Sequence, residues 1–111
     1  MKTIIAGGRD YETADGDFEI IKNMDIDEVV CGGARGADEY GKQWAERLGI
    51  PVRMFRAEWK LHGKSAGPIR NRQMAEYADA LIAFWDGKSR GTKNMIETAR
   101  KCGLKVTIIR Y

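Results

Sequence analysis

Three glycine-rich turns carry residues that suit the binding of phosphate. They are Gly7-Gly8, the run from Gly32 to Gly36, and Gly87 to Gly91, and each follows a short apolar run. Glycine lets the backbone turn tightly and approach a ligand, and the start of a following helix offers free N–H groups to an anion. Tight packing between a strand and a helix also favours glycine, so one such turn is weak evidence. Three in one short chain indicate a phosphate-bearing ligand, although neither a Walker A motif nor a Gly-x-Gly-x-x-Gly dinucleotide fingerprint is present.

The charged residues near these turns are biased toward positive charge. Segments 7–12, 32–37, 56–72 and 86–93 hold ten Lys or Arg residues against four Asp or Glu residues, whereas the whole chain has a net charge of +3. A solvated loop surface explains the polarity of these segments but not the sign. The residues of the first two turns that we expect to surround a phosphate are Gly7, Gly8, Arg9, Gly33, Ala34, Arg35 and Gly36, and we expect the nearby Asp38 to contact the ligand as well.

Four further residues are candidates for ligand contacts. Arg70 falls in the first turn of a predicted helix, where a guanidinium can bind a phosphate through two hydrogen bonds, and the adjacent Asn71 can bond a ribose hydroxyl or a base. Gly91 and Thr92 open the last predicted helix. The Thr92 hydroxyl either caps that helix or contacts a phosphate.

Trp59 and Trp85 are the aromatic candidates, since both lie at the ends of predicted strands or in the loops that follow them. Either indole can stack on a base. Trp85 can equally close the hydrophobic core, because it ends the most apolar run of the chain.

Carboxylates in the same segments leave an enzymatic role open. Cleavage of an N-glycosidic bond passes through an oxocarbenium-like ribosyl group, which a carboxylate stabilises or whose attacking water it activates. Glu58 is the leading catalytic candidate, followed by Asp86 and then Asp38. For Glu58, a salt bridge with a nearby Arg or Lys in the same loop is a slightly better interpretation than a catalytic role. We expect no cofactor and no metal site, because two cysteines and one histidine make no ligand set.

The elements that position these residues alternate regularly. Apolar runs predict strands over 2–6, 27–31, 51–55, 79–85 and 105–109, and amphipathic spacing predicts helices over 14–24, 37–48, 67–77 and from Gly91 to Gly103, with residues 56–66 irregular. Buried strands that alternate with helices predict an α/β fold, with a small doubly wound parallel sheet and helices on both faces. Ligands of such sheets bind beyond the carboxyl ends of the strands, where the glycine-rich turns fall.

Length and composition set the limits of the whole molecule. The 111 residues suffice for one domain, 1–111, and 43% hydrophobic with 32% charged residues is typical of a soluble globular protein. A membrane span needs roughly 20 apolar residues, and no run approaches that. The start of the chain shows no signal peptide, and Cys31 and Cys102 suit a reducing compartment, so we expect a cytoplasmic protein without membrane contact.

Four of these motifs together resemble the YspA-type branch of the SLOG superfamily. The matching blocks are Gly32 to Asp38 (GGARGAD), Ala57-Glu58-Trp59, Gly67 to Met74 (GPIRNRQM) and Gly91-Thr92, in the order and spacing of the family. That superfamily includes the LOG phosphoribohydrolases, the DNA-processing protein DprA and domains that sense nucleotide signals such as cyclic ADP-ribose in bacterial and phage conflict. The resemblance implies a Rossmann-like sheet of strand order 3-2-1-4-5 and a nucleotide-derived ligand.

One departure separates the chain from the LOG enzymes. Their PGGxGTxxE block carries a glutamate three residues after the threonine, and here Met95 takes that position. Glu97 lies two residues later, about 200° further round a helix, and does not substitute for it. Asn71 likewise replaces the lysine of the LOG Arg-Lys motif, so the resemblance supports phosphate binding better than LOG chemistry.

We therefore expect a sensor or sponge that holds a nucleotide or an ADP-ribose-type molecule. The alternatives are an N-glycosidic hydrolase acting on a nucleotide derivative, and nucleic-acid binding through the basic edge, which a net charge of +3 makes the weakest. Whether the protein forms a homo-oligomer stays open.

Overall fold

The computed structural model describes all residues, 1–111, and alternates strands with helices along the chain. The elements are β1 (Lys2–Gly7), α1 (Asp17–Lys22), β2 (Glu28–Cys31), α2 (Ala37–Leu48), β3 (Val52–Met54), α3 (Trp59–His62), the 3₁₀ turn η1 (Gly63–Ser65), α4 (Ala66–Tyr77), β4 (Ala80–Trp85), α5 (Arg90–Lys101) and β5 (Lys105–Arg110).

The five strands form one parallel sheet in the order β3-β2-β1-β4-β5. Ile4 in the central strand β1 pairs with Val30 of β2 and with Leu81 of β4, and Leu81 pairs in turn with Val106 of β5. The predicted doubly wound fold and the strand order implied by the family resemblance are both confirmed. The order changes direction between β1 and β4, which is where ligands of such sheets bind.

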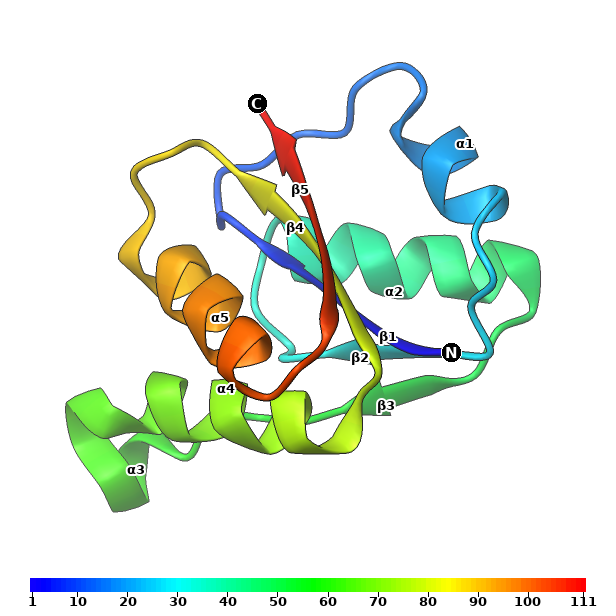
Figure 1. Ribbon diagram of the computed structural model, residues 1–111. Coiled ribbons are helices and arrows are strands. Elements are labelled where there is room, and N and C mark those ends of the chain that lie inside the picture. The colour runs from blue at the N-terminus through cyan, green and yellow to red at the C-terminus, as the bar shows by residue number, and fades with distance from the viewer.

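Helices cover both faces of the sheet, so the three central strands are buried on both sides (Figure 1). Helices α4 and α5 cover one face through apolar side chains such as Met74 and Ile96, which meet Ile4 and Leu81. Helices α1 and α2 cover the other, where Trp44 of α2 packs in one cluster with Phe84 of β4. Alternate residues of each strand thus enter different cores, which explains the nearly continuous apolar runs in the sequence.

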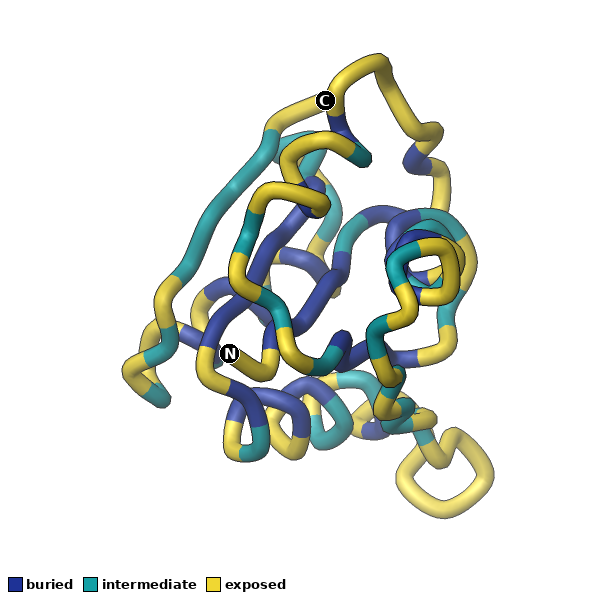
Figure 2. The backbone as a smooth tube through the Cα atoms, turned by 90° about the vertical axis from the view of Figure 1, so that its right-hand side faces the viewer, coloured by how far each residue is buried: buried dark blue, intermediate teal, exposed yellow.

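The segment predicted to be irregular, 56–66, is in fact mostly helical. It holds α3 and η1, and α4 begins at Ala66 rather than at Gly67. Residues 58–65 are all exposed and project from the body of the molecule (Figure 2). Periodicity missed these turns because a helix that buries no face leaves no apolar stripe in the sequence. The first helix is also shorter than 14–24, since Gly16 with φ +92° precedes it and Asn23 ends it.

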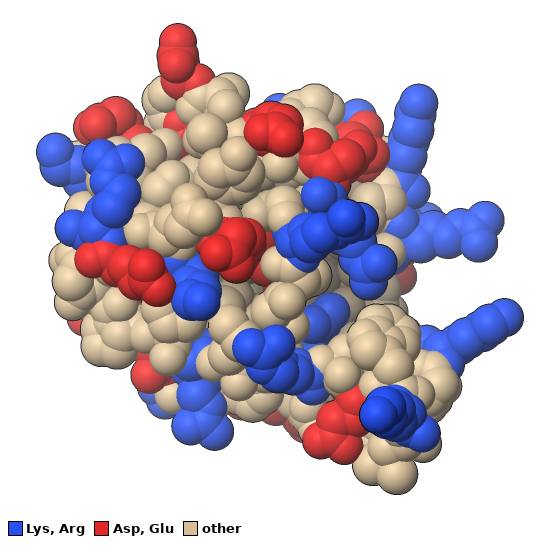
Figure 3. Space-filling view, turned by 180° about the vertical axis from the view of Figure 1, so that it is seen from behind, with Lys and Arg blue, Asp and Glu red and all other residues tan.

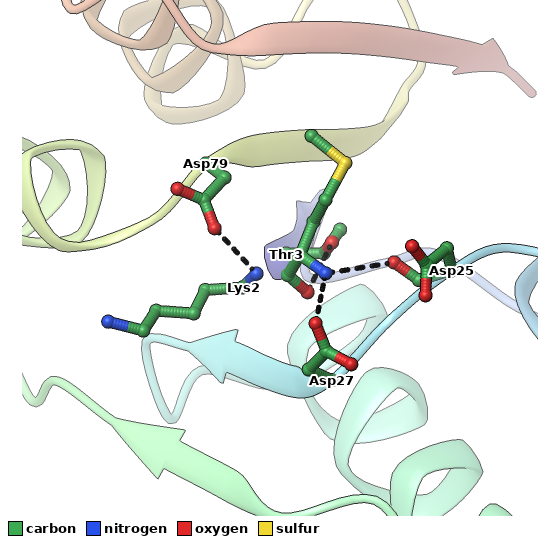
Figure 4. A network of polar contacts seen from close by, with 6 residues as sticks. Lys2, Thr3, Asp25, Asp27 and Asp79 are labelled. Atoms are coloured by element: carbon green, nitrogen blue, oxygen red, sulfur yellow. Dashed lines mark hydrogen bonds and ion pairs between the residues drawn. The ribbon is translucent and has the colours of Figure 1, made fainter.

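Three aspartates, Asp25, Asp27 and Asp79, lie around the amino ends of β1, β2 and β4 (Figure 4). The Met1 ammonium donates to the carbonyl of Asp25 and to a carboxylate oxygen of Asp27, and the backbone N–H of Lys2 donates to Asp79 at 2.9 Å. These contacts tie the starts of β1, β2 and β4 together.

None of the helices combines the length and the apolar character that crossing a bilayer requires.

Candidate functional site

A cavity of about 540 Å³ lies at the carboxyl ends of β1 and β4, beside the starts of α4 and α5. We call it the main cavity. Ten of the residues predicted to contact a ligand line it: Gly7, Gly8, Arg9, Ala34, Asp38, Trp59, Arg70, Asn71, Gly91 and Thr92. Topology brings them together from four separate chain segments, at the point where the strand order reverses.

The turns after β1 and β2 touch each other, and glycine is required at the contact. A Cβ on Gly7 would lie 2.8 Å from the Cβ of Ala37, and a Cβ on Gly36 would lie 2.2 Å from the carbonyl oxygen of Gly8. Gly36 also has φ +73°, in the region that favours glycine. The Gly8 carbonyl accepts the N–H of Ala37 at 3.2 Å, which fixes the start of α2 beside the β1 turn. Both glycines therefore have a packing role before any ligand is considered.

Asp38 holds the glycine-rich turn after β2 in shape. Its side chain is buried, and its Oδ2 accepts the backbone N–H of Gly32 at 2.9 Å and that of Ala34 at 3.4 Å. Burial raises the pKa of this carboxyl to about 6, although the positive charge of Arg70 and the two N–H donors act in the opposite direction. Asp38 lines the main cavity, but its carboxylate is already engaged by the backbone.

Arg70 and Asn71, on the second turn of α4, join three parts of the site. Arg70 Nη1 donates to the carbonyl of Gly32 at 2.7 Å, and its Nε donates to Asn71 Oδ1 at 3.1 Å. Asn71 Nδ2 in turn donates to Asn94 Oδ1 of α5 at 3.0 Å. Burial lowers the pKa of Arg70, and Asp38 opposes that shift. The guanidinium thus donates one N–H group to Gly32 and one to Asn71, and its remaining N–H groups are free to bind a ligand.

The start of α5 differs from the sequence-based expectation. The helix begins at Arg90, and its capping residue is Ser89 rather than Thr92: Ser89 Oγ accepts the backbone N–H of Thr92 at 3.4 Å and lies 3.0 Å from Thr92 Oγ1. Sequence reasoning missed Ser89, Arg90 and Asn94, all of which line the main cavity. Serine is a preferred N-cap residue, so a serine just before the last predicted helix is a signal that would have found the first of them.

Six of the predicted residues lie outside the main cavity: Gly33, Arg35, Gly36, Glu58, Trp85 and Asp86. Gly33 and Arg35 line a neighbouring hollow, whereas hydrogen bonds to the backbone hold Trp85 and Asp86. The Trp85 indole N–H donates to the Ser89 carbonyl at 3.1 Å, and Asp86 Oδ1 accepts the N–H groups of Lys88 and Ser89 at 2.8 Å each. Those backbone bonds lower the pKa of Asp86 and identify it as a turn-forming residue. Glu58 lines a separate small hollow beside α3, and Gly36 lines another beside α2.

A second hollow of about 360 Å³ adjoins the main cavity, and we call it the arginine recess. It is lined by Arg9, Gly32, Gly33, Ala34, Arg35, Arg56, Ala57, Trp59 and Arg70, a set with four arginines and no carboxylate. Arg9, Ala34, Trp59 and Arg70 line the main cavity as well. Lys and Arg side chains gather around a hollow on the side of the molecule that carries α3 (Figure 3).

Comparison with known proteins agrees with the family resemblance of the sequence. Residues 1–62 match the model of the YspA, cpYpsA-related SLOG family. The chain is 42% identical over 84 residues to "Gene 61 protein" of Mycobacterium phage D29, a match that covers 70% of this chain and 67% of that protein. No solved structure matches. The chain therefore belongs to the YspA, cpYpsA-related SLOG family.

Proposed function

We propose that the protein binds a nucleotide-derived small molecule, with a phosphate group in the main cavity. The observation that carries this proposal is the convergence of positive groups on one cavity: Arg9, Arg70 and Arg90 line it together with the start of the twelve-residue helix α5. Unpaired N–H groups at a helix start and guanidinium groups are the protein's usual partners for phosphate. Membership of the family supports a nucleotide-related ligand.

Trp59 suits the base of such a ligand. Its side chain is about half exposed, at 51%, and it forms one wall of both hollows. An exposed indole next to a cationic cavity provides a flat surface on which a purine or pyrimidine can stack, worth about 1–3 kcal/mol per base. The phosphate and base contacts together define a ligand with one charged and one aromatic end.

We further propose that the ligand is held rather than cleaved. Of the carboxylates, only Asp10 and Asp38 line the main cavity. Asp10 accepts the Tyr111 hydroxyl at 2.8 Å, and Asp38 accepts two backbone N–H groups. Met95, at the position of the LOG glutamate, is a buried wall of the cavity. This arrangement favours a sensor or sponge over an N-glycosidic hydrolase.

Titration of AMP and ADP-ribose, with chromatography of the mixtures, tests both parts. We expect binding without product, and we expect Arg70→Ala to weaken it by about 1.5–3 kcal/mol, the contribution of a charge-assisted hydrogen bond. Arg72→Ala is the matched control, because Arg72 lies two residues along α4 and pairs only with Glu76 at 3.8 Å. Equal losses in the two variants would remove Arg70 from the site, and free base or ribose product would show an enzyme.

A further inference from the structure

The arginine recess concentrates positive charge, and none of its arginines forms an ion pair within the protein. The only ion pairs between charged groups within 4.0 Å are Met1–Asp27, Arg72–Glu76 and Lys93–Glu97, so none of the four recess arginines has one. Three of the four, Arg9, Arg35 and Arg56, are exposed at its rim. Like charges that face one cavity repel one another, and an anion that enters relieves the repulsion.

The backbone shapes the floor of the recess. Gly32 is buried between two charged side chains: a Cβ there would lie 2.2 Å from Arg70 Nη1 and 2.9 Å from Asp38 Oδ2. Gly33, with φ +75°, turns the chain beneath Arg56, whose Nη1 would lie 3.4 Å from a Cβ at that position. The guanidinium groups of Arg56 and Arg70 are thus set on either side of the same glycine-rich turn.

We propose that the arginine recess is a second anion subsite, which takes a second phosphate group of the ligand held in the main cavity. This inference rests on the proposed function and narrows the ligand to a nucleotide with two phosphate groups. Arg9, Ala34, Trp59 and Arg70 are walls of both hollows, so one molecule can extend from one to the other. Arg35 and Arg56 line the recess but not the main cavity, so substitutions there test the recess separately.

The test compares nucleotides that differ in phosphate number. AMP carries one phosphate, and ADP and adenosine 3′,5′-bisphosphate carry two. We expect at least one of the latter to bind the wild-type protein about tenfold or more tightly than AMP does, as one added charge-assisted hydrogen bond predicts. Arg35→Gln and Arg56→Gln should remove most of that advantage and leave the AMP affinity unchanged. Lys60→Gln, an exposed cation of α3 outside both hollows, is the control and should change neither affinity.

Two results would overturn the subsite: equal affinity of the wild type for all three nucleotides, or an advantage that survives in the Arg35→Gln, Arg56→Gln double variant. If no nucleotide binds at all, the proposed function fails, and a titration with inorganic diphosphate then tests the recess separately. Diphosphate binding that the double variant abolishes supports the subsite by itself, and absence of such binding eliminates it.

Discussion

Asp38 is a carboxyl group whose environment gives it a measurable pH response. Burial raises its pKa from 3.8 to about 6, so between these values the folded protein binds a proton that the unfolded chain has released. The free energy of unfolding therefore increases as the pH falls through 6. The change is about 1 kcal/mol between pH 7 and pH 5 and approaches about 3 kcal/mol below pH 4, at 1.36 kcal/mol per pKa unit.

Urea unfolding of the wild type and of Asp38→Asn at pH 7, 6 and 5 measures this response. The asparagine oxygen can accept the N–H groups of Gly32 and Ala34 but does not titrate, so the variant should lack the increase. Parallel pH profiles of the two proteins would show that Asp38 titrates near its ordinary value.

At the scale of single residues, the sequence predicted which kinds of side chain lie near the site better than it predicted their hydrogen-bond partners. Asp38, Asp86 and Glu58 are all carboxylates after predicted strands, yet one holds a buried turn, one forms an exposed turn and one lies in a separate hollow. Which backbone N–H a carboxylate accepts depends on distances of a few ångströms that spacing along the chain does not encode.

The helices show which elements the sequence can reveal. The helix predicted over 37–48 matches α2, and the last predicted helix matches α5 to within a few residues, because both bury one apolar face against the sheet. Helix α3 buries no residue, and the sequence did not predict it. The cavity is thus formed by well-predicted helices on one side and by an unpredicted, exposed turn, with Trp59, on the other.

Two helical glycines should respond to substitution in opposite ways. A Cβ on Gly41 of α2 would lie 2.7 Å from Ile5 Cγ2 in the core, whereas a Cβ on Gly91 of α5 would meet nothing within 4 Å. Gly41→Ala should therefore lower the free energy of unfolding by about 1–3 kcal/mol through overpacking. Gly91→Ala should raise it by about 0.5–1 kcal/mol, because alanine has the higher helix propensity.

Thermal or urea unfolding of both variants checks this pair, and an AMP titration adds a second reading. Since Gly91 lines the main cavity, Gly91→Ala should produce a protein that is more stable but binds AMP more weakly. A gain in stability with unchanged AMP affinity would place the ligand away from the start of α5.

At the scale of the whole molecule, five arginines line two adjoining hollows: Arg9, Arg35, Arg56, Arg70 and Arg90. The cavities of about 540 and 360 Å³ suit a nucleotide. We expect AMP affinity to fall by less than about tenfold between roughly 50 and 200 mM salt, because it carries a single phosphate. An oligonucleotide that contacts six or more phosphates would lose about a thousandfold over the same interval.

Fluorescence titration of AMP and of a labelled single-stranded oligonucleotide across this salt series makes the comparison. Tight oligonucleotide binding with a steep salt dependence would reverse our ranking and identify a nucleic-acid-binding protein. Weak oligonucleotide binding at every salt concentration agrees with a small ligand.

The carboxylates that surround the amino ends of the strands have a consequence for how the molecule meets its ligand. Asp25, Asp27 and Asp79 lie at one end of the sheet and the arginine recess lies at the other, so carboxylates and guanidinium groups are separated along the strands. The electric field of an approaching phosphorylated ligand favours orientations of the protein that turn the arginine recess toward it. Productive encounters are therefore selected by orientation in solution, at distances up to about 8–10 Å in physiological salt, before any side chain touches the ligand.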